Sequence, residues 1–113
     1  MRCMVIIKST PESEKEGFLP DPQLMADMSK FNEELIKAGV VLAMDGLQPS
    51  SKGARVKFSG KSRTVVDGPF TEAKELIGGW ALMEARDKDE AVEWTKRFLA
   101  IAGAGESTIR QVY

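Results

Sequence analysis

The residue best suited to acid–base chemistry is Asp45, a carboxylate between Met44 and Gly46 in an otherwise apolar stretch. A carboxylate at the end of a buried strand can act as a general base or can hold a ligand. Gly46 would let a ligand or another backbone approach closely. The alternative is that the strand has already ended and that Asp45 begins a solvated turn. The sequence leaves both interpretations open.

The composition removes most other catalytic arrangements. The chain has 113 residues, no histidine and a single cysteine, Cys3. Histidine is the commonest general base and completes the Ser–His and Cys–His nucleophile pairs, and structural zinc sites are built from Cys and His. Acid–base chemistry must therefore use carboxylates, lysine, Tyr113 or water, and we expect neither a metal nor a cofactor.

Three further side chains are candidates for ligand binding, namely Asp67, Lys74 and Arg110. Asp67 opens an Asp-Gly-Pro turn in which its side chain can accept hydrogen bonds from nearby backbone N–H groups, so shaping the turn is the leading interpretation. Lys74 lies in a charged loop that either lines the mouth of a pocket or forms local ion pairs in solvent. Arg110, in the last expected strand, could pair with Asp45 or with an anionic ligand.

Two other patterns have structural interpretations. Residues 52–63 carry five basic side chains and no acidic one, but no aromatic residue is expected on the polar face with Arg55 and Lys57, and the net charge of the whole chain is −1. We therefore do not expect nucleic-acid binding. Gly78-Gly79 indicates a bulge or a close approach of another backbone or ligand. The surrounding sequence lacks the glycine spacing of a phosphate-binding loop.

Hydrophobic periodicity predicts the elements that must position these residues. Three stretches are apolar on both faces of a strand pattern. Two others carry an amphipathic helical stripe between a capping aspartate, Asp21 or Asp87, and a glycine. The stripes are Leu24, Met28, Phe31 and Leu35 in the first helix, and Ala91, Val92, Thr95, Phe98, Leu99 and Ala102 in the second. Gly60-Lys61 fits the type II′ turn of a hairpin in which Ala54, Val56, Phe58 and Val65 share one face. The expected elements, in order, are a strand at 2–8, a helix at 22–38, a strand at 40–47, a hairpin of 54–59 and 62–66, a strand at 76–85, a helix at 88–102 and a strand at 108–113.

This order predicts a ferredoxin-like α+β sandwich (β-α-β-hairpin-β-α-β), with two helices on one face of an antiparallel sheet. Helices on one face leave the other face of the sheet uncovered, although its strands are apolar on both sides. A second copy of the chain would cover it, so burial alone predicts a homodimer.

Length and composition agree with one domain spanning residues 1–113, with 42% hydrophobic and 29% charged residues. The apolar run at the start is too short for a signal peptide, and no stretch of the sequence approaches the ~18 apolar residues of a membrane span. A lone cysteine allows no intramolecular disulfide, so we expect a cytoplasmic protein.

The segment Asp67-Gly-Pro-Phe70, followed by Thr71-Glu-Ala-Lys-Glu-Leu-Ile-Gly-Gly-Trp80, resembles the DGPF group of the YCII-related proteins. Gly46-Leu-Gln-Pro-Ser-Ser-Lys-Gly-Ala-Arg-Val56 and Ile109-Arg-Gln-Val-Tyr113 resemble the same group. The similarity covers nearly the whole chain in three separated motifs. It implies a ferredoxin-like, dimeric α+β barrel, which agrees with the fold expected from periodicity.

The resemblance also implies functions. Some relatives are small enzymes that act on chlorinated aromatic or lactone substrates, and DGPF-type genes are often linked or fused to sigma-factor genes, which implies a role in transcription initiation. YCII itself resembles an enzyme with a His–Asp pair, which a chain without histidine cannot form. DGPF relatives usually have glutamate at the position of Asp45, so this chain keeps the carboxylate on a shorter side chain.

Three hypotheses follow. The first is a small homodimeric protein that binds a small molecule or acts as an accessory, with its cleft near residues 67–80. The second is a metal-free lyase- or hydrolase-like enzyme on a small aromatic or lactone substrate, with Asp45 as the base and Lys74 or Arg110 stabilising negative charge. The third rests on the resemblance alone and is a transcription-associated factor with a sigma factor as partner. In each of them, residues 67–70 are interpreted mainly as a fold-setting turn.

Overall fold

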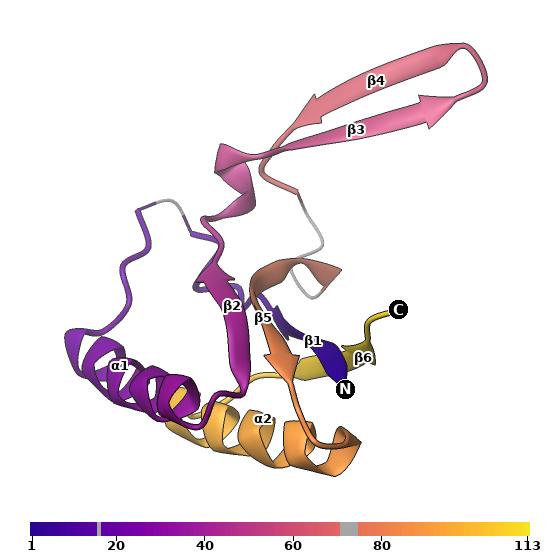
Figure 1. Cartoon of the computed structure of the whole chain (residues 1–113). Helices are drawn as coiled ribbons and strands as arrows, with labels where there is room; N and C mark the ends of the chain where they lie inside the picture. The colour runs from indigo at the N-terminus through magenta and orange to yellow at the C-terminus, as the bar shows by residue number, and fades with distance from the viewer. Residues whose placement is uncertain (16, 71–74) are drawn as a thin grey trace.

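The computed structural model describes residues 1–15, 17–70 and 75–113. The elements follow the order expected from the sequence, with boundaries that differ by two residues at most (Figure 1). The sequence does not predict the short 3₁₀ turn η1. The elements are β1 (Arg2–Lys8), α1 (Pro22–Lys37), β2 (Val41–Gly46), η1 (Ser50–Lys52), β3 (Ala54–Ser59), β4 (Ser62–Asp67), β5 (Ile77–Glu84), α2 (Lys88–Ala102) and β6 (Ser107–Gln111).

One antiparallel sheet contains β2, β5, β1 and β6 in that spatial order. The first and last strands of the chain are therefore neighbours, with Cys3 opposite Gln111. Both α1 and α2 pack on the same side of this sheet (Figure 1). This arrangement confirms the ferredoxin-like α+β class. No helix in the described part of the chain is long and apolar enough to cross a membrane.

The core lies between the helices and the sheet. Cys3 and Val5 of β1 point into it and are 0% and 4% exposed, whereas Met4 and Ile6 alternate to the opposite side. Burial raises the pKa of the Cys3 thiol, so this thiol stays protonated and unreactive at neutral pH. The remaining buried apolar residues are Phe31, Leu35, Val40, Met83, Ala85 and Ala91.

The side of the sheet that faces away from the helices is called the open face. The register pairs Met4 with Leu82 and Ile6 with Trp80, so these four apolar side chains form a band across β1 and β5. All four residues are partly exposed. No helix in the described part of the chain packs on this band. The homodimer that is expected to cover it stays a prediction.

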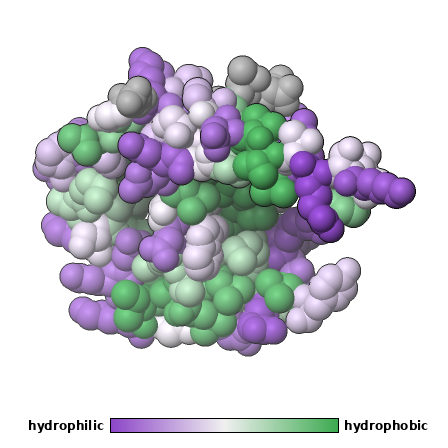
Figure 2. All heavy atoms as spheres, turned by 90° about the horizontal axis from the view of Figure 1, so that it is seen from above, coloured by the Kyte–Doolittle hydropathy of each residue, from purple (hydrophilic) through white to green (hydrophobic). Residues whose placement is uncertain are grey.

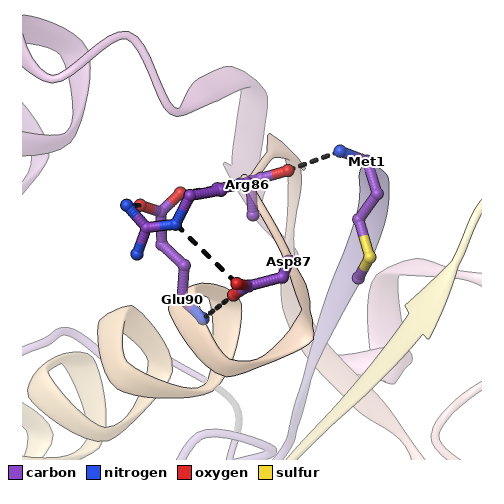
Figure 3. A network of polar contacts seen from close by, with 5 residues as sticks. Met1, Arg86, Asp87 and Glu90 are labelled. Atoms are coloured by element: carbon purple, nitrogen blue, oxygen red, sulfur yellow. Dashed lines mark hydrogen bonds and ion pairs between the residues drawn. The ribbon is translucent and has the colours of Figure 1, made fainter.

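The start of α2 is held by a capping arrangement at Asp87 (Figure 3). Asp87 Oδ1 accepts a hydrogen bond from the Glu90 N–H at 2.9 Å, as the sequence predicts. Glu90 Oε1 accepts from the Arg86 N–H at 2.9 Å, one residue before the N-cap. The amino group of Met1 donates to the Ala85 carbonyl, which ties the start of β1 to the same corner.

The hairpin of β3 and β4 forms a separate two-stranded sheet that projects away from the rest of the chain (Figure 1). Ser59 pairs with Ser62, and Gly60 has a φ of 57°, in agreement with the expected type II′ turn. All residues of both strands are exposed. The radius of gyration is 15.7 Å, against about 13 Å for a compact chain of this length. We call residues 54–67 the arm, and we call β1, β2, β5, β6, α1 and α2 the body.

Candidate functional site

A cavity of about 460 Å³ lies between the helices and the sheet, where β2 ends and β5 begins. In the view from above, apolar side chains gather around a hollow (Figure 2). Three strands and both described helices contribute to the cavity wall, which is mainly apolar. Its largest apolar side chains include Phe31 and Leu35 from α1, Trp94 and Phe98 from α2, and Val5 and Ile7 from β1.

Three aromatic rings form the helical side of this wall. The Phe31 ring centroid lies 6.0 Å from that of Trp94 and 6.5 Å from that of Phe98. The Arg97 guanidinium lies over Phe31 and Trp94, 5.3 Å and 4.9 Å from the ring centroids. Arg97 Nη2 also donates to Glu34 Oε2 at 2.6 Å, and this hydrogen bond lowers the pKa of the Glu34 carboxyl. The ion pair therefore joins α1 to α2 behind the aromatic wall.

The cavity has a sparse set of polar side chains, namely Asn32, Asp45 and Thr95. The Thr95 hydroxyl donates to the Ala91 carbonyl at 2.8 Å and is already satisfied within α2. The side chains of Asn32 and Asp45 have no hydrogen bond within residues 1–15, 17–70 and 75–113. No lysine or arginine belongs to the described part of the wall. The site can therefore offer a ligand an amide and a carboxylate, but no cation.

Asp45 lies in the wall at the end of β2, next to the paired glycines Gly46 and Gly79. Its register partner is Trp80, which in turn pairs with Ile6. Because directly paired residues of an antiparallel sheet share a face, the Asp45 side chain lies on the open face. Asp45 is exposed and forms no ion pair with any described residue. Asp45 therefore borders the cavity at the end of β2, while its carboxylate faces the open side of the sheet.

The structure does not bring the other candidate residues to Asp45. Arg110 lies on β6, opposite Met4, at the other edge of the sheet. Asp67 ends β4, pairs with Ala54 and is exposed on the arm. Lys74 lies outside the described residues. Of the three candidates within the described residues, only Asp45 belongs to the cavity wall.

The Asp67-Gly-Pro-Phe70 segment connects the arm to two loops. A Cβ on Gly68 would lie 1.7 Å from the Ser50 carbonyl oxygen, so only glycine fits there. The Phe70 N–H donates to Ser50 Oγ at 3.0 Å, and the Ser50 hydroxyl and N–H donate to the Glu14 carboxylate. The Arg55 guanidinium lies 4.3 Å from the Phe70 ring centroid. These contacts agree with the interpretation of the motif as a fold-setting turn.

The glycine pair of β5 has the structural role that its sequence indicates. The register with β1 shifts after Ile7, which places Gly78 in a bulge. A Cβ on Gly78 would lie 3.3 Å from Ser9 Cα, and one on Gly79 would lie 3.2 Å from the Asp45 carbonyl oxygen. The glycines therefore allow the close backbone approach that forms this end of the cavity.

Asn32 is a cavity residue that the sequence analysis does not identify. It lies four residues after Met28, which belongs to the predicted apolar stripe of α1 and also lines the cavity. A polar side chain within an apolar helical stripe is a signal that sequence reasoning could have used. Trp94 is likewise absent from the predicted stripe of α2, although its ring packs against Phe31.

The fold and cavity define a ferredoxin-like α+β protein with an apolar pocket beneath the sheet. A solved structure of this class is the 5-chloro-2-hydroxyhydroquinone dehydrochlorinase of Burkholderia phenoliruptrix AC1100 in complex with 2,5-dihydroxybenzoquinone. It matches with a TM-score of 0.52 and 15% identity over 100% of this chain and 94% of that chain. This likeness establishes the shared fold.

The chain belongs to the YCII-related domain family, whose model matches residues 1–113. An uncharacterized protein of Rhizobium meliloti (strain 1021) is 30% identical over 76 residues. The match covers 67% of this chain and 61% of that relative, so the chain accounts for less than two thirds of the relative's length.

Proposed function

We propose that the protein is a small homodimer that binds a small, largely apolar molecule in the cavity between its helices and its sheet. The cavity is the observation that carries the proposal. Its volume of about 460 Å³ lies within the roughly 300–1,000 Å³ of ligand pockets. Its wall is mainly apolar and aromatic with a few polar side chains, which is the composition typical of small-molecule sites.

The wall indicates the chemistry of this occupant. Phe31 and Trp94 offer aromatic faces for a flat ring. Asn32 can donate or accept hydrogen bonds, whereas an ionised Asp45 only accepts them. An anionic ligand would find no counter-charge in the described wall and would lose its hydration. A neutral ring with hydroxyl or amino donors fits best. The complex of the Burkholderia enzyme with 2,5-dihydroxybenzoquinone supports only the size and flat shape of such a ligand.

Hydroquinone and benzoate, which have similar size but different charge, test this proposal. In NMR titrations, hydroquinone is expected to shift the amide signals of cavity residues, and benzoate is expected to bind at least about tenfold more weakly. Ala81→Met places extra volume in the cavity wall and should weaken hydroquinone binding. Ala26→Met is the matched control, because Ala26 is exposed on α1 and does not line the cavity. Hydroquinone shifts that are absent, or equal in both variants, would contradict the proposal.

A second candidate function is proton-transfer catalysis with Asp45 as the general base. It is favoured by a carboxylate next to the cavity end that has no described hydrogen-bond partner, so its oxygens are available to a substrate. Asp45→Asn keeps the size of the side chain but removes its basicity, so the variant should still bind a substrate while losing turnover by about a hundredfold or more. Equal turnover in both proteins would exclude this role.

The homodimer is supported by the apolar band of Met4, Ile6, Trp80 and Leu82 on the open face. Size-exclusion chromatography with light scattering at low micromolar concentration should give twice the chain mass, and a well-folded monomer would contradict it. A cytoplasmic location is part of the same proposal, and its support is the single buried thiol of Cys3.

A further inference from the structure

The charges on the open face point to a specific contribution of the second copy. Asp45 lies on this face of β2, in register with Trp80. Arg110 lies on the same face of β6, because it pairs with Met4. Both residues are exposed, and neither side chain has a hydrogen bond or ion pair within the described ranges. A carboxylate and a guanidinium thus mark the opposite edges of one uncovered apolar face.

These two charges cannot meet within one chain. β2 and β6 are the outer strands of the order β2-β5-β1-β6, and three strand spacings amount to about 14 Å. Other charged groups on this face do have partners in the chain. Arg2 Nη2 donates to the Tyr113 carbonyl at 3.5 Å, and Glu84 lies 3.7 Å from the amino group of Met1. Asp45 and Arg110 are the pair left without partners in the described structure.

A two-fold axis between facing sheets can be oriented in two main ways. With the axis along the strands, the β2 edge of one copy faces the β6 edge of the other. With the axis across the strands, β2 faces β2 and β6 faces β6. The second arrangement brings like charges together at both edges, which is unfavourable. The first brings a carboxylate and a guanidinium together at both edges of an isologous interface. Asp45 is level with Ile6, and Arg110 is level with Met4. The pair is therefore offset by two residues, or about 7 Å along the strands, which a long arginine side chain can span. The charge pattern therefore selects the first arrangement.

We propose that a second copy packs its open face on this one with the two-fold axis along the strands, and that the partner's Arg110 binds Asp45 across the interface. The proposal rests on the homodimer proposed above and deepens it. Each dimer has two such ion pairs, one at each edge, and the apolar band of each sheet lies between them. A guanidinium binds a carboxylate with two parallel hydrogen bonds and fixes its orientation.

The ion pair would complete the candidate site. The described cavity wall has a carboxylate at its end but no cation. The partner's Arg110 brings a permanent positive charge to that end. There its charge is balanced by the Asp45 carboxylate, which it holds in one orientation, so the pair as a whole adds no net charge that would attract an anionic ligand. One chain alone therefore has an incomplete site.

Charge exchange tests the proposal in solution. Asp45→Arg and Arg110→Asp each place like charges at both edges of a homodimer, so each variant is expected to raise the dimer dissociation constant by about tenfold or more. An equimolar mixture of the two variants should dimerise nearly as well as the wild type. In that heterodimer, the introduced arginine faces the introduced aspartate, and native Asp45 faces native Arg110. Analytical ultracentrifugation measures the dissociation constants, and circular dichroism verifies that each variant is folded.

The matched control is a mixture of Glu33→Arg and Lys30→Asp. Both residues are exposed on α1, away from the sheet, and they produce the same changes in net charge. Each control variant should dimerise as the wild type does, and their mixture should show no gain over either variant alone. Milder variants, Asp45→Asn and Arg110→Gln, provide a double-mutant cycle that does not depend on reversed charges, and its coupling energy should be non-zero.

The possible failures are distinguishable. A dimeric wild type whose charge-exchanged mixture is no stronger than the single variants, or whose cycle shows no coupling, overturns the ion pair and leaves the homodimer intact. A rescue of equal size in the Glu33 and Lys30 control also overturns it, because general charge attraction would then explain the effect. A monomeric wild type overturns the homodimer and the ion pair together. Hydroquinone binding to the cavity is measured independently of these outcomes.

Discussion

The body and the arm contain strands of similar length, but their side chains meet very different surroundings. In the body, β1 pairs on both sides and lies under the helices, so Cys3 is 0% exposed and Val5 is 4% exposed. In the arm, Val56, Phe58 and Val65 share one face, as the sequence predicts, yet they are 69%, 67% and 63% exposed. Similar apolar patterns therefore lead to burial in one region and to exposure in the other.

A strand pattern therefore specifies pairing more strongly than it specifies burial. The arm forms its own ladder and turn, but a two-stranded hairpin is at best marginally stable by itself in water. Its connection to the rest of the chain includes the contacts of Gly68, Ser50, Phe70 and Glu14. The stability of the arm should therefore depend on this junction, whereas the stability of the body should depend on its core.

Hydrogen exchange should show the largest contrast between the two regions. Central amides of β1 are expected to open only with global unfolding, which costs about 5–15 kcal/mol in a typical domain. Arm amides should open locally and exchange at least about a thousandfold faster in dilute solution. Mass spectrometry or NMR can measure both rates in one sample. Equal protection of the arm would mean that another surface covers it.

Truncation of one apolar side chain in each region should lower the free energy of unfolding by different amounts. Leu35→Ala in the body should lower the free energy of unfolding by about 3 kcal/mol, because Leu35 is 6% exposed and its removal leaves a cavity. Val56→Ala in the arm should lower it by roughly 0.5 kcal/mol or less. Urea denaturation of dilute protein provides both values, and similar losses would remove the distinction between the regions.

The junction should respond to a single added methyl group. Gly68→Ala places a Cβ 1.7 Å from the Ser50 carbonyl oxygen, so the loops must separate at a cost of about 2 kcal/mol. Gly53→Ala is the control, since its Cβ would lie 3.5 Å from the same oxygen at a φ of −113°. The free energy of unfolding and the hydrogen-exchange rates of the arm amides should both change in Gly68→Ala and hardly change in Gly53→Ala. Equal values in the two variants would contradict the close contact between Gly68 and Ser50.

The smallest effect should be the pH dependence of the ion pair between Glu34 and Arg97. The hydrogen bond from Arg97 lowers the pKa of Glu34 in the folded state. Its stabilising contribution is therefore present above the unfolded-state pKa and is lost as the pH falls through the lowered folded-state pKa. The melting temperature of the wild type should be slightly higher than that of Glu34→Gln at neutral pH. This difference should vanish in acid and at high salt. The arm strands contain no acidic residue before Asp67, so arm exchange should not follow this titration.

Much of the fold follows from local chemistry and was therefore predictable. The helix starts at Pro22 and Lys88 depend on the neighbouring caps Asp21 and Asp87, and the hairpin register depends on Gly60-Lys61. The projection of the arm was not predictable, because it depends on which surfaces meet in three dimensions. The turn at Ser50–Lys52 was missed because its contacts come from Glu14 and Phe70, which are distant in the sequence.

The candidate site was predictable only in part. Asp45 could be selected because a charge in an apolar strand is unusual, and the structure places it at the cavity. The sequence suggests that Arg110 could pair with Asp45, but it cannot show that the two residues lie at opposite edges of one face. That placement depends on strand order and register. The cavity itself depends on the packing of five elements and has no local signature.

The exposed turn of the arm is a position at which this fold should tolerate insertions. A Cβ at Gly60 would meet nothing within 4 Å, and the turn lies at the end of a projecting hairpin (Figure 1). Loop tips of this kind tolerate spliced segments, because no buried backbone has to move. A fluorescent or affinity module inserted between Gly60 and Lys61 would leave the cavity and the open face unobstructed. The same position could accommodate an extra domain gained in evolution, at little cost to the parent structure.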